Sequence, residues 1–502
     1  MLDIVLGTAG KLQLLTMDDL RDKEEKLEVV VKFSDITDSD GAIFHREIDV
    51  HPDDRTKSLE ICLEALQDPE DEENLLVTRW CPGRGEIRNL TRSQVEAIGW
   101  RYLSAQRQTS AKALEGSSGA VYAMVEALES QLGEEKETLS DALESFNSVL
   151  GSSEAVQEML GEVARHFSKA LPNQFRKEDL SLRTQNDPSD TVLKNTTLFL
   201  TNNGWDSPIT EQSDGMRQLI SLTLFDLVEG GNQIVAIDEP EIHLHPSGQR
   251  TIAQLLNSGA SQKILVTHSS HIVQNFPPET VLAITSSGSS HQLDAENFRL
   301  QAEEEAHWWS PQILELLTAS SVIVVEGIAD RIIVEAAARA KGISLDRIGA
   351  IIFVLGGSGN FPAVYKLLGK KGFDIPVYGL VDDDSKDKWL GQVPGKLKDR
   401  IDHVVFVSNN DLEDEYCQAL GAREVATRLV ENRVINNIDS VVDSAGVEDI
   451  SFVMPSQMAS YCRGKKVASA LAVAKTMTED NANKIQSIKR LLDKLVSTLQ
   501  NE

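Results

Sequence analysis

The sequence predicts an α/β protein built around parallel sheets. Short apolar segments rich in Val, Ile and Leu alternate with segments of helical spacing, first over residues 196–268 and again over 320–384. Parallel strands that are buried on both faces give such segments, and helices supply the crossovers between them. Because 502 residues exceed what a single hydrophobic core supports, we expect at least two domains.

Composition and charge narrow the class of protein. Hydrophobic residues make up 41% and charged residues 25%, which is typical of a globular protein. The formal net charge of −29 argues against a broadly basic surface for nucleic acid, so any phosphate contact must be local or carried by metal ions. The four cysteines form no CxxC pair, and the chain has neither a membrane-length apolar run nor a secretory signal. We therefore expect a cytoplasmic protein without a membrane span.

The order of segments suggests the domain boundaries. The first hundred residues mix acidic loops with short runs of β-branched residues, which predicts a β-rich lobe. Residues 111–175 are rich in Ala, Leu and Glu at helical spacing, which predicts a helical arm whose apolar faces could support dimerisation. A charged segment separates the two strand–helix alternations. The expected domains are residues 1–312 and 313–502.

In the first alternation, an apolar strand ends in acidic residues. The segment "QIVAIDEPEIHLHP" places Asp238 and Glu239 at the carboxyl end of the strand, where open α/β sheets bind ligands. An aspartate there can hold Mg²⁺, and a glutamate can polarise a water for attack on a phosphate. The alternative is an acidic helix start that only complements the helix dipole.

Two flanking segments sharpen this interpretation. "TEQSDGMRQ" precedes the acidic strand and "ILVTHSS" follows it, and together the three resemble the signature loop, Walker B strand and H-loop of ABC-type ATPases. The resemblance implies that Asp238 takes the Mg²⁺ role, Glu239 the catalytic-base role and His268 the γ-phosphate sensor role. It also implies a signature loop that faces ATP held by a second subunit, with Ser213, Gly215 and Arg217.

The phosphate-binding loop of such ATPases is missing from this sequence. A P-loop needs GxxxxGK followed by Ser or Thr. Four lysines follow a glycine, but Leu or Lys comes next in every case: Lys11, Lys370, Lys396 and Lys465. The first twenty residues resemble the segment that follows a P-loop, so we expect a chain that starts just after it, as a truncation or as a natural variant. We accordingly expect poor ATP binding and negligible ATP hydrolysis.

The second alternation also delivers carboxylates to strand ends. Glu326 follows "SSVIVV" and Asp330 begins the next helix, while "VYGLV" is followed by Asp382, Asp383 and Asp384. Residues two apart share a face of an extended segment, so Asp382 and Asp384 are expected to point to one site and Asp383 away. Carboxylates that gather repel one another unless Mg²⁺ or Mn²⁺ neutralises them. The alternative is an acidic loop without a ligand.

This pattern resembles the topoisomerase-primase (Toprim) domain. A Toprim domain directly after an ATPase with "DEPEIHLHP" is similar to the OLD (overcoming lysogenization defect) family, ATPase-linked nucleases that cut DNA with two metal ions, several of them in anti-phage defence. The resemblance implies metal ligation by Glu326, Asp330, Asp382 and Asp384, and by a later acidic motif that falls best on Asp411 and Glu413, with Glu415 as an alternative register. It also implies a lysine that stabilises charge on the scissile phosphate, either Lys466 or Lys465.

The leading functional hypothesis is a Mg²⁺- or Mn²⁺-dependent DNA endonuclease whose ATPase domain serves dimerisation and regulation. Expected partners are DNA, further copies of the chain and a defence-system protein such as a helicase. A second hypothesis is a topoisomerase-like enzyme with a tyrosine nucleophile, for which the candidates are Tyr378, Tyr416 and Tyr461. The third is a non-enzymatic, ATP-gated protein that tethers DNA.

Overall fold

The computed structural model divides the chain into two compact units, Met1–Asn275 and Phe276–Glu502. No helix in the described part of the chain is long and apolar enough to span a bilayer. The division falls upstream of the boundary between residues 312 and 313 that the sequence suggests, and that boundary stays a prediction. The structure describes all residues except 21, 24, 38–40, 54, 70, 84–86, 104–119, 132–152, 185–195, 203, 229–233, 259–260, 285–287, 294–308 and 500–502.

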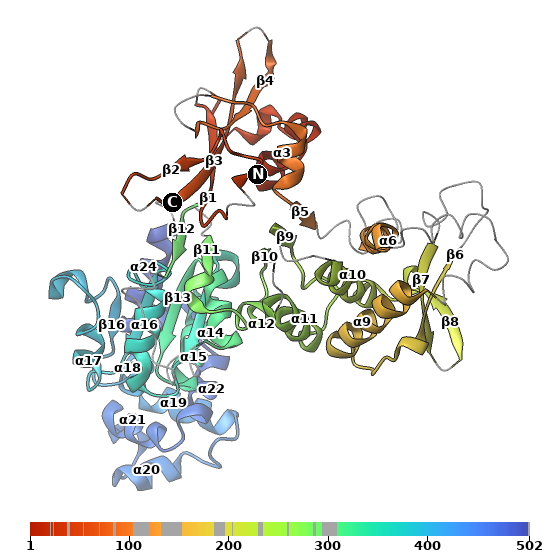
Figure 1. The fold of residues 1–502 in the computed structure, drawn as a ribbon. Helices are drawn as coiled ribbons and strands as arrows, with labels where there is room; N and C mark the ends of the chain where they lie inside the picture. Colours follow the sequence, from red (N-terminus) through yellow and green to blue (C-terminus); the bar gives the residue numbers. More distant parts are fainter. Residues whose placement is uncertain are drawn as a thin grey trace. The chain divides into compact units, whose positions relative to one another are not determined.

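The first unit contains short strands and helices in mixed order (Figure 1). Its strands are β1 (Leu27–Phe33), β2 (Asp49–Val50), β3 (Lys57–Asp68), β4 (Asp71–Trp80), β5 (Trp100–Leu103), β6 (Leu180–Thr184), β7 (Thr196–Asn202), β8 (Trp205–Pro208), β9 (Ile234–Asp238) and β10 (Gln262–Val266). Its helices are α1 (Leu2–Leu6), α3 (Arg92–Ala97), α6 (Ala120–Gln131), α9 (Glu154–Ala170), α10 (Asp214–Val228), α11 (Pro246–Ser258) and α12 (Ser270–Val273).

A parallel sheet in the order β10-β9-β5 holds the acidic strand of the first unit at its centre. Strand β9 pairs in parallel with β5 and with β10, and Asp238 lies opposite Val266. Because β9 has a neighbour on each side, its three central residues, Val235–Ile237, are buried. The carboxyl ends of β9 and β10 therefore lie together at one edge of the sheet.

Strand β7 departs from the sequence prediction of a parallel alternation. It lies in a separate antiparallel sheet, between β6 and β8. Asn202 pairs with Trp205 across a tight turn in which Gly204 has a φ of 81°, a left-handed conformation that glycine adopts at little cost. The Asn-Gly dipeptide in the sequence is a hairpin signal that outweighs the apolar run before it.

Two helices of the expected arm lie within the described residues. They are α6 and α9, and both pack against α10. One face of α9 is buried, with Val163 and Phe167 fully enclosed. The rest of the expected arm, residues 111–119 and 132–152, lies outside the described residues. Its role in dimerisation stays a prediction.

The second unit contains a parallel sheet with helices around it and a separate two-stranded antiparallel sheet (Figure 1). Its strands are β11 (Leu282–Ile284), β12 (Ser290–Gln292), β13 (Ser321–Val325), β14 (Ala350–Val354), β15 (Val377–Val381) and β16 (Val405–Val407). Its helices are α14 (Pro311–Leu314), α15 (Ile328–Ala340), α16 (Phe361–Leu368), α17 (Lys386–Leu390), α18 (Leu412–Leu420), α19 (Ala422–Glu431), α20 (Asp439–Ala445), α21 (Pro455–Arg463), α22 (Lys466–Lys475), α23 (Glu479–Lys484) and α24 (Gln486–Leu499).

Four of these strands form one sheet in the order β14-β13-β15-β16, and all of its pairs are parallel. Residues of β13 and β15 are almost completely buried, as expected for central strands of a parallel sheet. Helix α15 packs against α22, α18 packs against α21, and α24 packs against β15 and β16. These packings bring the last third of the chain back to the strands that begin the unit.

Candidate functional site

The two central strands of the second unit deliver acidic residues to the same edge of the sheet. Val325 of β13 lies opposite Leu380 of β15, so Glu326 and Asp382 follow from neighbouring strands that run in the same direction. In open α/β sheets this carboxyl edge is where ligands bind. The predicted acids therefore have the placement that the sequence pattern requires.

Glu326 is half-buried and surrounded by negative charge. Its pKa is raised by burial, then by the nearby charges of Asp330 and Asp384, while hydrogen bonds from Ser385 and from the backbone of Asp382 partly offset the rise. Its Oε1 atom is buried and has no hydrogen-bond partner among the described residues. An oxygen in this state lacks a positively polarised partner.

The neighbouring acids share this environment. Asp330 lies in the first turn of α15, where its Oδ2 accepts a hydrogen bond from the Gly327 N–H at 2.8 Å. Burial raises its pKa. Burial, with the charges of Asp330 and Glu326, raises the pKa of Asp382 to about 8. Ionising the whole cluster therefore costs free energy unless positive charge is brought in.

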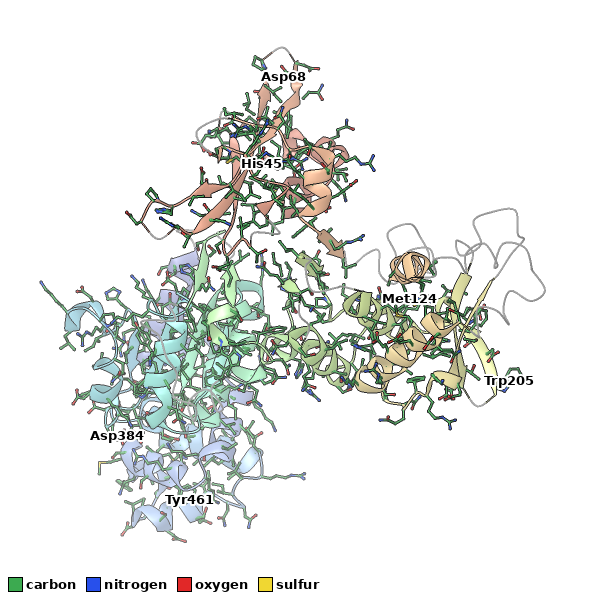
Figure 2. The ribbon with its side chains drawn as sticks, viewed as in Figure 1. His45, Asp68, Met124, Trp205, Asp384 and Tyr461 are labelled. Carbon is green, nitrogen blue, oxygen red and sulfur yellow. The ribbon has the colours of Figure 1, made fainter. Side chains whose placement is uncertain are left out.

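The residues that follow β15 point in different directions. Asp383 is exposed and pairs with Lys386, whose Nζ lies 2.7 Å from Asp383 Oδ1. Asp384, labelled in Figure 2, accepts a hydrogen bond from Ser385 Oγ at 2.9 Å and lies close enough to raise the pKa of Glu326. The charge of Asp384 thus acts on Glu326 and the charge of Glu326 acts on Asp382, whereas Asp383 has its own partner in Lys386.

Helices α18 and α22 add a carboxylate and a lysine to the cluster. Glu413 is buried, with a raised pKa caused first by that burial, and Lys466 Nζ lies 3.6 Å from its Oε2. Burial lowers the pKa of Lys466, but the charges of Glu413, Asp382 and Asp330 outweigh burial and raise it. Asp411 raises it as well, so Lys466 is a charged ammonium that interacts with four carboxylates.

The structure separates the alternatives that the sequence left open. Lys465 turns away from the cluster, donating from Nζ to the Val434 carbonyl at 3.3 Å. Glu415 has both oxygens engaged elsewhere, Oε1 by the Asn409 N–H at 2.9 Å and Oε2 by Ser487 Oγ at 2.7 Å. The cluster thus contains Lys466 rather than Lys465, and Glu413 rather than Glu415.

Asp411 is placed differently from the other predicted ligands. As the N-cap of α18, its Oδ1 accepts a hydrogen bond from the Asp414 N–H at 2.8 Å, and its Oδ2 accepts one from Arg463 Nε. Both oxygens are therefore occupied by protein groups. A role for Asp411 as a metal ligand stays a prediction.

The carboxylate oxygens of this cluster are chemically suited to bind a divalent cation. Glu326 Oε1 and Glu413 Oε2 are buried and accept no hydrogen bond from the described residues, and carboxylate oxygens are the ligands that Mg²⁺ and Mn²⁺ prefer. Within the described ranges, no three acidic, histidine or cysteine side chains converge tightly enough to form a complete ligand set. The identity of the full ligand set is therefore a proposal.

The residues that the sequence predicts to take part in nucleotide binding lie at one edge of the parallel sheet of the first unit, β10-β9-β5. Asp238 ends β9 and accepts a hydrogen bond from Tyr102 Oη at 3.2 Å, and Glu239 follows with a φ of 47°. The exposed His268 lies two residues beyond β10, whose Val266 accepts a hydrogen bond from the Glu239 N–H at 2.8 Å. The structure brings Asp238, Glu239 and His268 to one edge.

Glu241, for which the sequence predicts no role, also lies at this edge of the sheet. Its Oε2 accepts from Thr267 Oγ1 at 2.7 Å, and its Oε1 accepts from the His268 N–H at 2.8 Å. It therefore ties the loop after β9 to the loop that carries His268. The signal in the sequence was the third acid of "DEPE", four residues before His245.

The predicted signature residues lie at the start of α10. Arg217 donates to the carbonyls of Thr210 and Gln212, at 3.0 and 2.8 Å, and so holds the turn before the helix. Ser213 Oγ accepts from the Met216 N–H at 3.4 Å. A Cβ on Gly215 would lie 2.5 Å from the His243 carbonyl, so this position needs glycine for close approach to the loop after β9.

Comparisons with known families agree with this architecture. Residues 19–273 match the model described as AAA ATPase domain, and residues 317–384 match the model described as Overcoming lysogenization defect protein-like, TOPRIM domain. No curated protein matches the chain.

Solved structures show weaker likeness. The C-terminal region of the Burkholderia pseudomallei OLD protein is 23% identical, with 36% of this chain and 98% of that chain covered and a TM-score of 0.30. The C-terminal region of the OLD protein from Xanthomonas campestris pv. campestris is 27% identical, with 36% of this chain and 97% of that chain covered and a TM-score of 0.28. A Smc head domain from Pyrococcus furiosus is 15% identical, with 55% of this chain and 80% of that chain covered and a TM-score of 0.30. These TM-scores are low, and the assignment rests on the two family matches.

The fold and its sites define a two-part α/β protein, with a nucleotide-type sheet edge followed by a carboxylate-rich one. Since the first match spans just over half of the chain, the chain belongs to the AAA ATPase domain family, and its ATPase domain is followed by an OLD-like TOPRIM domain. The resemblance seen in the sequence is confirmed. AAA ATPase domains bind nucleotide and TOPRIM domains generally bind divalent metals, and this pairing suggests a nuclease-type function.

Proposed function

We propose that the protein is a DNA endonuclease that hydrolyses phosphodiester bonds at the TOPRIM site with Mg²⁺ or Mn²⁺. The observation that carries this proposal is the position of Lys466, which faces Glu413 and is charge-coupled to Asp382 and Asp330. An ammonium among carboxylates is suited to a substrate that carries negative charge into an acidic site. A phosphodiester backbone is such a substrate.

Five acidic residues are proposed to hold the cations: Glu326, Asp330, Asp382, Asp384 and Glu413. The chemistry supplied by bound divalent cations is polarisation of the scissile phosphate and activation of a water. The acidic side chains would hold the cations in place for this reaction. Burial of the carboxylates excludes bulk water, which strengthens every charge interaction in the site.

Lys466 supplies a fixed positive charge for the phosphate. Its Nζ is 3.6 Å from Glu413 Oε2, and its raised pKa keeps the ammonium protonated at neutral pH. The negative charge that accumulates on the phosphate oxygens in the transition state is stabilised by such a group more than the charge of the ground state.

The tyrosine candidates favour hydrolysis over a covalent topoisomerase-like mechanism. Tyr378 Oη lies 3.3 Å from Thr498 Oγ1, and Tyr461 Oη lies 3.2 Å from Ser440 Oγ. Tyr416 is buried, with 1% of its surface exposed. Each phenol is therefore engaged or enclosed, and we propose water as the nucleophile.

The experiment that tests the proposal is plasmid nicking with Mg²⁺ or Mn²⁺. We expect the parent protein to nick supercoiled DNA and Glu326→Ala to lose cleavage by about 10²-fold or more, because its unpartnered carboxylate oxygen is removed. Glu335→Ala is the matched control, since Glu335 pairs with Arg331 at 2.6 Å on the exposed side of α15. A protein–DNA adduct would instead support a topoisomerase, and binding without cutting would support a tether.

Lys466→Ala is expected to slow cleavage by about 10²–10³-fold with little change in DNA affinity, because the ammonium acts on charge that develops in the transition state. Lys465→Ala, the adjacent lysine bonded to Val434, should cut like the parent. Single-turnover cleavage at saturating protein measures both variants. Equal losses in the two variants would contradict the role of Lys466.

We also propose that the ATPase domain serves self-association and regulation, in the cytoplasm, in a defence system against phage. Asp238, Glu239 and His268 gather at one sheet edge, and Gly215 lets the start of α10 approach the same loop. Ser213 and Arg217 are proposed to face a second copy of the chain, and to meet ATP there only when the phosphate-binding loop that this sequence lacks is present. A helicase is the proposed accessory partner.

A further inference from the structure

A second set of charged side chains borders the carboxylate cluster, and one of them, Asp411, adds its negative charge to that of Asp382 and Glu413. Arg463 is the last residue of α21 and donates through Nε to Asp411 Oδ2 and through Nη2 to Asp414 Oδ2. Asp414 is buried, with 6% of its side chain exposed. One guanidinium therefore binds two acids of α18 at once, and we refer to these three residues as the Arg463 clamp.

The clamp also fixes the turn before α18. Asp411 caps the helix through the Asp414 N–H, and the Asn410 side-chain amide donates to Asp414 Oδ2. Asn410 has a φ of 68°, a left-handed conformation that asparagine tolerates better than most residues. The Asn410 carbonyl accepts a hydrogen bond from the Asp383 N–H at 2.9 Å. The clamp is thus connected to the backbone between Asp382 and Asp384.

The position of the clamp along the chain relates it to the proposed active site. Glu413 lies between the two acids of the clamp on α18, and Lys466 begins α22 three residues after Arg463. Fixing α21 to the first turn of α18 therefore fixes the turn that carries Lys466 relative to Glu413. Through Asn410 the same contacts reach the Asp382–Asp384 segment. Three separate chain segments of the site converge on this clamp.

The charges explain why an arginine is needed there. Asp411 and Asp414 are like-charged and close, so they repel each other unless a cation lies between them. An arginine can donate to two acceptors in a fixed planar geometry, whereas a lysine presents a single point charge. The exposed Arg423–Asp449 pair, 3.4 Å apart, lacks such burial, and pairs of that kind contribute little.

We propose that Arg463 is a positioning residue that sets the placement of Glu413 and Lys466, and that Asp411 and Asp414 serve this clamp rather than bind metal. The proposal rests on the metal-dependent nuclease function argued above. Groups that orient metal ligands from behind typically change metal affinity or activity by about 10–100-fold when removed.

The test compares Arg463→Ala, Arg463→Lys and the control Arg423→Ala in the full chain, by electron paramagnetic resonance of free Mn²⁺ and by plasmid nicking. We expect Arg463→Ala to weaken Mn²⁺ binding and lower kcat by about 10–100-fold, with KM for DNA changed less than about twofold. Arg463→Lys should recover part of the loss, because it restores the charge without the two-point geometry. Arg423→Ala should match the parent.

The outcomes separate this inference from the proposed function. Amide exchange over residues 409–415 reports whether the clamp has opened, and Arg463→Lys serves as the readout if Arg463→Ala does not fold. Unchanged Mn²⁺ binding and cleavage in either folded Arg463 variant with faster exchange would overturn the positioning role. A greater loss of Mn²⁺ binding in Asp411→Asn than in Arg463→Ala would make Asp411 a ligand and overturn it too. A parent protein that binds Mn²⁺ without cutting DNA overturns only the nuclease function, whereas one that binds no Mn²⁺ overturns both.

Discussion

Replacing Asp382 by alanine is expected to abolish metal-dependent DNA cleavage, with a loss of about 10³-fold or more. Asp382 follows the central strand β15, and its pKa of about 8 reflects burial and then the charges of Asp330 and Glu326. Removing Asp382 takes away a proposed cation ligand at the centre of the site.

The same substitution should not destabilise the fold. Because the folded-state pKa of Asp382 lies above its ordinary value of 3.8, the folded state binds this proton more tightly than the unfolded state. The resulting stabilisation is complete below about pH 3.8 and is lost as the pH rises through about 8. Above about pH 8 the ionised carboxylate therefore opposes folding, and Asp382→Ala should keep or raise the midpoint of thermal unfolding.

Asp383→Ala is the matched control for this prediction. Asp383 is the next residue of the same loop, is exposed, and pairs with Lys386 rather than with the cluster. Its backbone N–H, which donates to Asn410, is retained in the variant. Single-turnover nicking and thermal unfolding should show parent behaviour. Cleavage that survives in Asp382→Ala, or that is lost equally in Asp383→Ala, would remove Asp382 from the proposed site.

Strand-end acids were predictable from the sequence because a local rule determines their placement. Apolar segments such as "SVIVV" and "VYGLV" predict central parallel strands, and parallel neighbours bring their carboxyl ends together whatever the rest of the fold does. Glu326 and Asp382 follow directly from that rule. The ATPase acids at the end of β9 follow from it as well.

Helical and loop residues were not predictable to the same degree. Glu413 and Glu415 are two apart on α18, so they point to different sides of the helix, and only the packing of α24 gives Glu415 its partner in Ser487. Lys465 has a φ of −140°, outside the helix, whereas Lys466 begins α22. A single sequence cannot distinguish Glu413 from Glu415, or Lys466 from Lys465, because both distinctions depend on tertiary packing.

Arg463 shows the same limit. It lies 52 residues from Asp411 and 49 from Asp414 along the chain, and nothing in "SYCRGKK" marks it apart from a surface arginine. Antiparallel pairing of β7 was missed for another reason, since its apolar run is compatible with either type of sheet. Periodicity predicts that a segment is a strand, whereas the turn at Gly204 decides its neighbour.

Trp389→Ala is expected to cost about 3–5 kcal/mol of local stability, as loss of a fully buried aromatic side chain does. Trp389 of α17 has no exposed surface and stacks on Phe361 of α16, with ring centroids 4.1 Å apart. The ring also packs on Gly379 in the middle of β15, where a Cβ would lie 2.8 Å from it. The glycine and the tryptophan are therefore complementary, and truncating the ring leaves a cavity beneath the strand that leads to Asp382.

Hydrogen–deuterium exchange of the β15 amides measures this loss within the second unit, without treating the whole chain as one cooperative transition. A cost of about 3–5 kcal/mol corresponds to exchange faster by about 10²–10³-fold or slightly more, since about 1.4 kcal/mol is a factor of ten. Trp205→Ala is the control, because Trp205, which lies on β8 and is labelled in Figure 2, is 81% exposed. Unchanged β15 protection in Trp389→Ala would mean that the stack does not hold the strand, and cleavage should then survive the substitution as well.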